Sequence, residues 1–124
     1  MAAKARAELI RFYSAAYQAN ERGAAETMLT DDFTFTSPYD DAIDRATYFA
    51  RCWPDSPAFK SITIERISED VDAAFVLYRC ETLDGKTFRN TELHAFRGDQ
   101  LRSVEVYFGA SYRDGVFIPQ NQSS

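Results

Sequence analysis

The stretch 73-AAFVLYRCETLDGKTFRNTELHAF-96 decides the fold of this chain. It contains two runs of strand-forming residues, 73–83 and 86–96, on either side of Asp84-Gly85, a dipeptide typical of tight hairpin turns. If Asp84 and Gly85 form a two-residue turn, Leu83 pairs with Lys86 and the remaining pairs follow. The stretch therefore predicts an antiparallel hairpin whose register can be written down.

This register assigns every side chain of the hairpin to a face. The expected cross-strand pairs are Arg79 with Asn90, Leu77 with Glu92, and Phe75 with His94. One face then carries Phe75, Leu77, Arg79, Glu81, Phe88, Asn90, Glu92, His94 and Phe96. Neither this face nor its reverse is cleanly polar, so we expect helices to cover one and a second subunit to cover the other. The sequence thus predicts a homodimer formed through the sheet.

Within the second strand, alternate positions place the only histidine, His94, beside the carboxyl group of Glu92 and the amide of Asn90. At the rise of a strand, the Cβ atoms of Glu92 and His94 are about 6 to 7 Å apart. Imidazole groups titrate near neutrality, which suits them to proton transfer. If the face lines a cavity, these groups form a catalytic site; otherwise His94 is a buried histidine satisfied by Glu92 or a tyrosine. The sequence leaves both interpretations open.

The hydrophobic pattern predicts helices before this hairpin. Residues 5–18 carry apolar side chains at helical spacing: Leu9, Phe12, Tyr13, Ala16 and Tyr17. Residues 24–29 predict a second short helix, and residues 33–36 alternate as a strand that Ser37-Pro38 closes. Residues 39–41 are expected to form a loop, and Asp44 is suited to cap a third helix that reaches Cys52.

After Pro57 the chain has strand composition throughout, in the runs 59–67, 73–83, 86–96 and 101–108. Gly98-Asp99 joins the last two runs as a second hairpin turn. Helices followed by an antiparallel meander predict an α+β domain in which one mostly antiparallel, strongly curved sheet wraps around three N-terminal helices. We expect a single domain over residues 1–119 and a polar tail over residues 120–124.

Composition narrows the classes of function. The 124 residues, 45% of them hydrophobic, suit one domain with a real core. A net charge of -5 with scattered basic residues disfavours binding to nucleic acid and to anionic membranes. The chain has no apolar run of membrane-spanning length and no signal-type apolar core, so we expect a cytoplasmic protein.

Metal and nucleotide motifs are missing from the sequence. Cys52 and Cys80 are not part of a CxxC motif or a histidine cluster, so reduced, packed thiols are the favoured interpretation. The chain has one histidine, no HExxH and no glycine-rich phosphate loop. We therefore expect neither a metal nor a cofactor.

The order of elements, together with the motifs TDDFTFTSP (residues 30–38) and SVEVYFG (residues 103–109), resembles a known family. The chain is similar over nearly its whole length to SnoaL-like and ketosteroid-isomerase-like members of the nuclear transport factor 2-like superfamily. That resemblance implies a cone-shaped (cystatin-like) α+β fold with a central pocket, and dimers are common among such proteins. Because the same scaffold hosts isomerases, dehydratases, cyclases and proteins without catalysis, it does not decide function.

The resemblance carries over unevenly to individual residues. In ketosteroid isomerase, a tyrosine from the first helix and a protonated acid from a late strand form the oxyanion hole. The matching positions here are Tyr13 and Glu92. The general base of that family is an aspartate before the proline that ends the first strand, and here Ser37 stands there. Because serine does not abstract a proton from a carbon acid unaided, classical ketosteroid isomerisation is not expected.

The remaining candidates are residues expected to bind a small hydrophobic substrate. They are Phe12, Phe35, Ser37, Trp53, Phe75, Arg79, Asn90, Val106 and Phe108, with Val106 and Phe108 on the inward side of the last strand. The apolar members would serve equally as an ordinary core, and Arg79 suits a structural ion pair with Glu81 or Glu92.

Three hypotheses follow from the sequence. The first is a cofactor-independent isomerase, dehydratase or cyclase in which Tyr13 and Glu92 stabilise an oxyanion and His94 moves the proton. The second is a small-molecule binding protein without catalysis, suggested by Ser37. The third is a dimeric structural module of the same fold.

Overall fold

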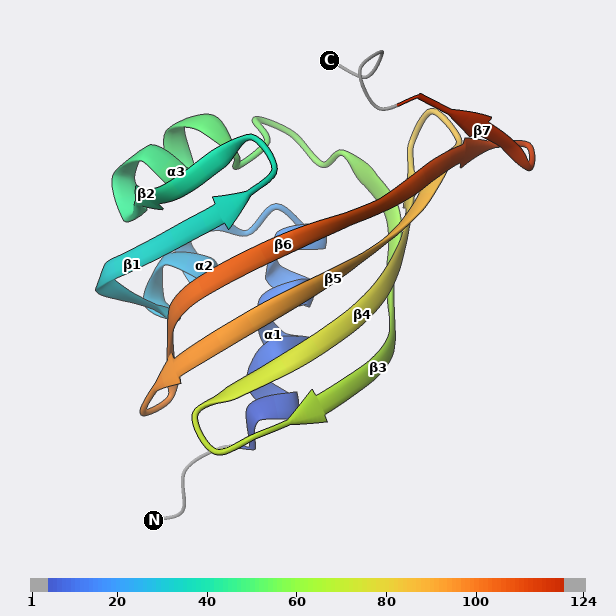
Figure 1. The fold of residues 1–124 in the computed structure, drawn as a ribbon. Helices are drawn as coiled ribbons and strands as arrows, with labels where there is room; N and C mark the ends of the chain where they lie inside the picture. The colour runs from blue at the N-terminus through green and yellow to red at the C-terminus, as the bar shows by residue number, and fades with distance from the viewer. Residues whose placement is uncertain (1–4, 120–124) are drawn as a thin grey trace.

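The computed structural model describes residues 5–119 as one strongly curved sheet with helices on its concave side (Figure 1). The helices are α1 (Arg6–Gln18), α2 (Arg22–Thr27) and α3 (Arg45–Arg51). The strands are β1 (Leu29–Ser37), β2 (Asp40–Asp44), β3 (Phe59–Glu69), β4 (Ala73–Thr82), β5 (Lys86–Arg97), β6 (Gln100–Arg113) and β7 (Val116–Ile118). The α+β class with a curved sheet around N-terminal helices is confirmed. The tail expected over residues 120–124 lies outside the described residues.

The sheet has the strand order β2-β1-β6-β5-β4-β3, with β7 paired to β6. All pairs are antiparallel except β1 with β6, which run parallel. The long strands β3 to β6 bend across α1, and α2 and α3 lie toward the β1 end (Figure 1). This curvature leaves the space in which the candidate site lies.

Local sequence signals account for the helices. Helix α1 buries Leu9, Ile10, Tyr13 and Ala16 against the sheet, as its apolar stripe predicts. Asp44 caps α3 by accepting a hydrogen bond from the Thr47 amide at 2.9 Å, which confirms the predicted N-cap. The predicted bounds of the second helix, residues 24–29, were wrong: the helix ends at Thr27, and Leu29 already belongs to β1.

Two segments that were not predicted to be strands belong to the sheet. Residues 40–44 form strand β2, which pairs back on β1 after a tight turn at Pro38 and Tyr39, so the loop expected at 39–41 is mostly strand. Strand β6 continues past Phe108 to Arg113 and turns into β7 through Asp114 and Gly115, both with positive φ. Two positive φ values are what a two-residue type I′ turn requires.

The predicted register of the hairpin between β4 and β5 is wrong by one residue. Glu81 pairs with Thr87, because residues 83–85 form a three-residue loop in which the Gly85 amide donates to the Thr82 carbonyl at 3.1 Å. Gly85 has φ +91, the left-handed conformation that follows a type I turn in such loops.

This shift moves every side chain of β4 to the opposite face, since side chains alternate along a strand. Phe75, Leu77 and Arg79 therefore lie on the outer face of the sheet. The concave face of β4 instead carries Ala74, Val76, Tyr78 and Cys80, opposite His94, Glu92, Asn90 and Phe88. The face assigned to β5 is unaffected.

The core lies between α1, α2, α3 and the concave face. Its largest fully buried side chains are Phe33, Ile10, Leu29, Leu101 and Cys80. None of the helices within residues 5–119 is long and apolar enough to cross a membrane.

Candidate functional site

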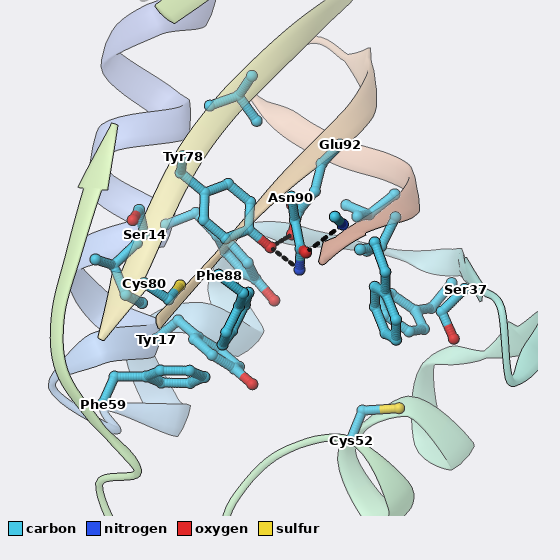
Figure 2. Close-up of a pocket in the computed structure, with 18 of the residues that line it drawn as sticks. Ser14, Tyr17, Ser37, Cys52, Phe59, Tyr78, Cys80, Phe88, Asn90 and Glu92 are labelled. Carbon is cyan, nitrogen blue, oxygen red and sulfur yellow. Dashed lines mark hydrogen bonds between the residues drawn. The ribbon is translucent and has the colours of Figure 1, made fainter. Parts of the chain in front are cut away.

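A cavity of about 550 Å³ lies between the concave face of the sheet and helices α1 and α3 (Figure 2). Its wall is rich in aromatic side chains: Tyr13, Tyr17, Phe35, Tyr39, Tyr48, Phe59, Tyr78, Phe88 and Phe108. Strand β5 supplies a row of polar groups, Asn90, Glu92 and His94, on the same wall. A mostly apolar cavity with a few convergent polar groups is typical of small-molecule sites.

The Glu92 carboxylate is the centre of a hydrogen-bonded network. Its Oε2 accepts from the Tyr78 hydroxyl at 2.5 Å, and Asn90 Nδ2 donates to the same hydroxyl at 3.2 Å (Figure 2). The Gly109 amide donates to Asn90 Oδ1 at 3.2 Å, where β6 departs from regular pairing with β5. The network therefore holds Glu92 in one orientation from two neighbouring strands.

His94 completes the network on the other side of Glu92. Its Nε2 lies 2.7 Å from Glu92 Oε1, and the residue is only 2% exposed. Its Nδ1 is buried without a hydrogen-bond partner among the described residues. Nε2 therefore faces the carboxylate, while no described residue binds the other ring nitrogen. His94 thus orients the carboxylate.

Tyr13 lines the cavity but does not bind Glu92. Its hydroxyl lies 2.5 Å from the hydroxyl of Tyr48, a residue of α3 that the sequence analysis did not select. Burial raises the pKa of Tyr13 well above its ordinary value, the hydrogen bond with Tyr48 opposes the rise, and the charge of Glu92 adds to it. One of the two hydroxyls donates and the other accepts, so one proton of the Tyr13–Tyr48 pair is left to donate to a ligand.

Tyr17 offers a further hydroxyl donor to the cavity. Its ring is held by Trp53 at 5.0 Å and Phe59 at 5.6 Å between centroids. Its hydroxyl projects into the space between α1 and Cys52 (Figure 2) and makes no hydrogen bond to the described residues. Burial, followed by the charge of Glu92, raises the pKa of Tyr17, so the hydroxyl keeps its proton. The helical spacing of Tyr13 and Tyr17 could have pointed to it, since both lie on the buried face of α1.

The other predicted site residues divide into two groups. Phe35, Ser37, Asn90, Val106 and Phe108 line the cavity together with Glu92 and His94. Four candidates do not line it: Phe12, Trp53, Phe75 and Arg79.

Each of the four has a physical reason for its position. Phe12 is 54% exposed, because α1 turns its neighbours Leu9 and Tyr13 toward the core instead. Trp53 is buried behind Tyr17 and Phe49. Phe75, 51% exposed, and Arg79 lie on the outer face because of the corrected register.

Near Ser37 the cavity wall carries a closed ion pair. Arg51 binds Asp40 at 2.8 Å, and the Cys52 thiol donates to the same carboxylate at 3.8 Å. Burial and then the nearby Asp40 raise the pKa of Cys52 to about 11, so this thiol is unreactive at neutral pH. The Ser37 hydroxyl accepts from the Tyr39 amide at 3.1 Å. No base other than the paired Asp40 lies at this end of β1 among the lining residues.

Within residues 5–119, no group of three His, Cys, Asp or Glu side chains is arranged to hold a metal ion. The cavity wall carries a carboxylate held by hydrogen bonds, an imidazole and several phenolic hydroxyls.

No family model matches the chain, and no curated protein matches it. Solved structures do match. A nuclear transport factor 2-like protein of unknown function from Cytophaga hutchinsonii is 21% identical, with a TM-score of 0.70, over 87% of this chain and 94% of that one. A protein named as a candidate ketosteroid isomerase from Kribbella flavida is 16% identical, with a TM-score of 0.72, over 93% and 83%.

A third match is a hypothetical protein with a ketosteroid isomerase-like fold from Catenulispora acidiphila, solved in complex with trimethylamine. It is 15% identical, with a TM-score of 0.60, over 82% of this chain and 85% of that one. At these identities the likeness establishes a shared fold. The function has to be argued from the cavity itself.

Proposed function

We propose that this chain, which has the nuclear transport factor 2-like fold, is a cofactor-independent enzyme that transfers a proton on a small, mostly apolar substrate, as an isomerase, dehydratase or cyclase does. One observation carries the proposal: the Glu92 carboxylate faces an aromatic cavity and is oriented by Tyr78 at 2.5 Å and His94 at 2.7 Å. Structural carboxylates in protein interiors are normally paired with lysine or arginine. The ion pairs within residues 5–119 join Glu92 to neither.

In the proposed reaction, Glu92 acts as the general base. A free lone pair of its carboxylate takes a proton from a carbon beside a carbonyl group; the electron pair of the C–H bond forms the C=C bond of an enolate, and the π pair of the carbonyl moves to its oxygen. The Tyr17 hydroxyl donates a hydrogen bond to that oxyanion, and Glu92 returns the proton to the same or a conjugated carbon. Atoms and charge balance without a further reactant.

These roles differ from the ones expected from the sequence. His94 was expected to move the proton, but its Nε2 is engaged by Glu92 and its Nδ1 is buried, which favours a positioning role. Tyr13 was expected to bind the oxyanion, and we assign that role to Tyr17 because the Tyr13 hydroxyl is paired with the hydroxyl of Tyr48. Glu92 was expected to donate a hydrogen bond as a protonated acid, and in this proposal it is the base. The position of Ser37 lacks the aspartate base of ketosteroid isomerase, so the proposed base comes from β5 instead.

The experiment uses 2-tetralone, a bicyclic ketone with acidic C–H bonds, in deuterated buffer. We expect the protein to accelerate exchange of those hydrogens, measured by proton NMR, and Glu92→Gln to reduce the acceleration about 100-fold. The matched control is Glu105→Gln, which removes the same charge from the neighbouring strand β6 on the outer face of the sheet. Equal exchange rates in Glu92→Gln and the wild type would refute Glu92 as the base.

A binding protein without catalysis is the second candidate. It is favoured by the hydrogen bonds that both Glu92 oxygens already accept from Tyr78 and His94, since these bonds also suit a carboxylate that only recognises a ligand. In that case 2-tetralone binds saturably, while its hydrogens exchange at the rate of buffer alone.

A further inference from the structure

We infer that the natural ligand of the cavity is a small organic cation, an amine or quaternary ammonium group on an apolar body. The inference rests on the proposed function in one respect, that the cavity is a small-molecule site. It goes beyond that function by naming the charge of the substrate.

The cavity wall carries few charged groups. They are Asp40, Arg51, Lys86 and Glu92, with the imidazole of His94 on the same wall. Asp40 and Arg51 neutralise each other at 2.8 Å. Lys86 and Glu92 belong to the same strand, six residues apart, which corresponds to about 20 Å. That separation exceeds the screening length of about 8 Å at physiological salt, so Lys86 does not compensate Glu92.

The partners of Glu92 are the Tyr78 hydroxyl and the imidazole of His94. These hydrogen bonds orient the carboxylate, but neither partner carries a permanent positive charge, and no lysine or arginine within residues 5–119 forms an ion pair with Glu92. The Glu92 side chain is only 17% exposed, and a charge removed from water without a counter-charge is unfavourable. A cationic ligand supplies the missing counter-charge.

The field of Glu92 reaches the walls around it. Burial is the main reason why the pKa values of Tyr17, Tyr78 and Cys80 are raised, to about 12 for Cys80, and the charge of Glu92 is the second reason for each. These groups belong to α1 and β4, on different sides of the cavity. The same negative potential attracts a cation and repels carboxylates and phosphates.

Aromatic rings supply the second half of the recognition. Tyr17, Phe59 and Phe88 form a continuous group, with centroid distances of 5.6 Å and 6.3 Å, and Phe35 lies 4.8 Å from Tyr48. All five line the cavity. Organic cations are attracted to aromatic rings, and their alkyl groups are also buried favourably there. A cation beside the reacting carbon would, in addition, acidify its C–H bond, which fits a carboxylate base.

The experiment compares three probes that share a branched alkyl head of one shape: choline, the neutral 3,3-dimethylbutan-1-ol and the anionic 3,3-dimethylbutanoate. Binding is measured by ligand-observed NMR at constant ionic strength. We expect choline to bind about tenfold more tightly than the alcohol, and the anion to bind most weakly. The preference for choline should vanish in Glu92→Gln and persist in Glu105→Gln.

Three results would overturn the inference: equal affinity for choline and the alcohol, an unchanged preference in Glu92→Gln, or no binding of choline at 50 mM, about 50,000-fold above a Kd of 1 μM. The assay needs no turnover, so the two proposals fail separately. A preference for the cation without exchange of 2-tetralone would refute the proposed proton transfer and support the cationic ligand. Exchange of 2-tetralone without a preference for the cation would support the proton transfer and refute the cationic ligand.

Discussion

Raising the pH provides a direct test of the cavity, because its wall contains four tyrosines that cannot ionise in place. Burial raises the pKa of each above the ordinary value of 10.0, and the negative charge of Glu92 adds to the rise for all four: Tyr13, Tyr17, Tyr48 and Tyr78. The other three of the seven tyrosines, Tyr39, Tyr107 and Tyr112, are exposed. We expect the four buried phenols to titrate only on unfolding.

The sign and size of the effect follow from linkage. When the pKa of a group is higher in the folded state than in the unfolded state, the group does not change the free energy of unfolding below its unfolded pKa. Above that pH the unfolded chain ionises first, so the free energy of unfolding falls as the pH rises toward the folded pKa. If none of the four ionises in the folded protein, the free energy of unfolding falls by about 5.7 kcal/mol at pH 11 and about 11 kcal/mol at pH 12. A domain of ordinary stability, about 5 to 15 kcal/mol, should therefore unfold between about pH 11 and pH 12.7.

The assay follows phenolate absorbance at 295 nm together with far-ultraviolet circular dichroism. Four phenolates should appear together with the loss of ellipticity, and Tyr48→Phe should remove one of these four. Ionisation of all seven tyrosines with an intact dichroism spectrum would refute the buried positions assigned to the four hydroxyls.

Three further predictions concern backbone packing, thiol chemistry and assembly. A Cβ added at Gly109 would lie 2.1 Å from the Arg89 carbonyl oxygen. Gly109→Ala should therefore lower the free energy of unfolding, measured by urea titration, by about 3 kcal/mol. Unchanged stability would contradict this close approach of the two strands. Because the pKa of Cys52 is raised to about 11 by burial and by its carboxylate neighbour, iodoacetamide should alkylate it far more slowly at pH 8 than in the unfolded chain, and equal rates would argue against that environment. The homodimer through the sheet stays a prediction. Phe75 and Tyr107 are 51% and 55% exposed on the outer face, where a dimer would bury them. Sedimentation equilibrium should therefore give a dimer that Tyr107→Glu dissociates, whereas a wild-type monomer at micromolar concentration would exclude the dimer.

Local patterns were sufficient for most of the elements. The apolar stripe of residues 5–18 and the cap at Asp44 depend on neighbours three or four residues away, and both were predicted correctly. The strand at residues 40–44 was not predicted, because its polar composition is not typical of a strand. It is extended because it pairs with β1, a contact that its own residues do not indicate. The cytoplasmic location was inferred from composition alone and stays a prediction.

The two Asp-Gly dipeptides show where local reasoning ends. Asp114-Gly115 forms the two-residue turn that such a dipeptide favours, with Arg113 paired to Val116. Asp84-Gly85 belongs to a three-residue loop instead, with Glu81 paired to Thr87. An Asp-Gly dipeptide permits both turns. The turn that forms is the one whose register lets the flanking strands bury their apolar side chains. Val76 is 2% exposed and Cys80 is 1% exposed in the observed register, which the predicted register would have turned outward.

The sequence by itself determined the fold class, the inward face of β5 and the presence of Asn90, Glu92 and His94 on it, because strand alternation is a property of the local backbone. Only the tertiary structure decided their partners. Tyr78 reaches Glu92 through a one-residue change in register, and Tyr48 takes the hydroxyl of Tyr13 across the space between α1 and α3. These contacts join residues that are 14 and 35 positions apart, and their geometry depends on how the whole sheet bends around the helices.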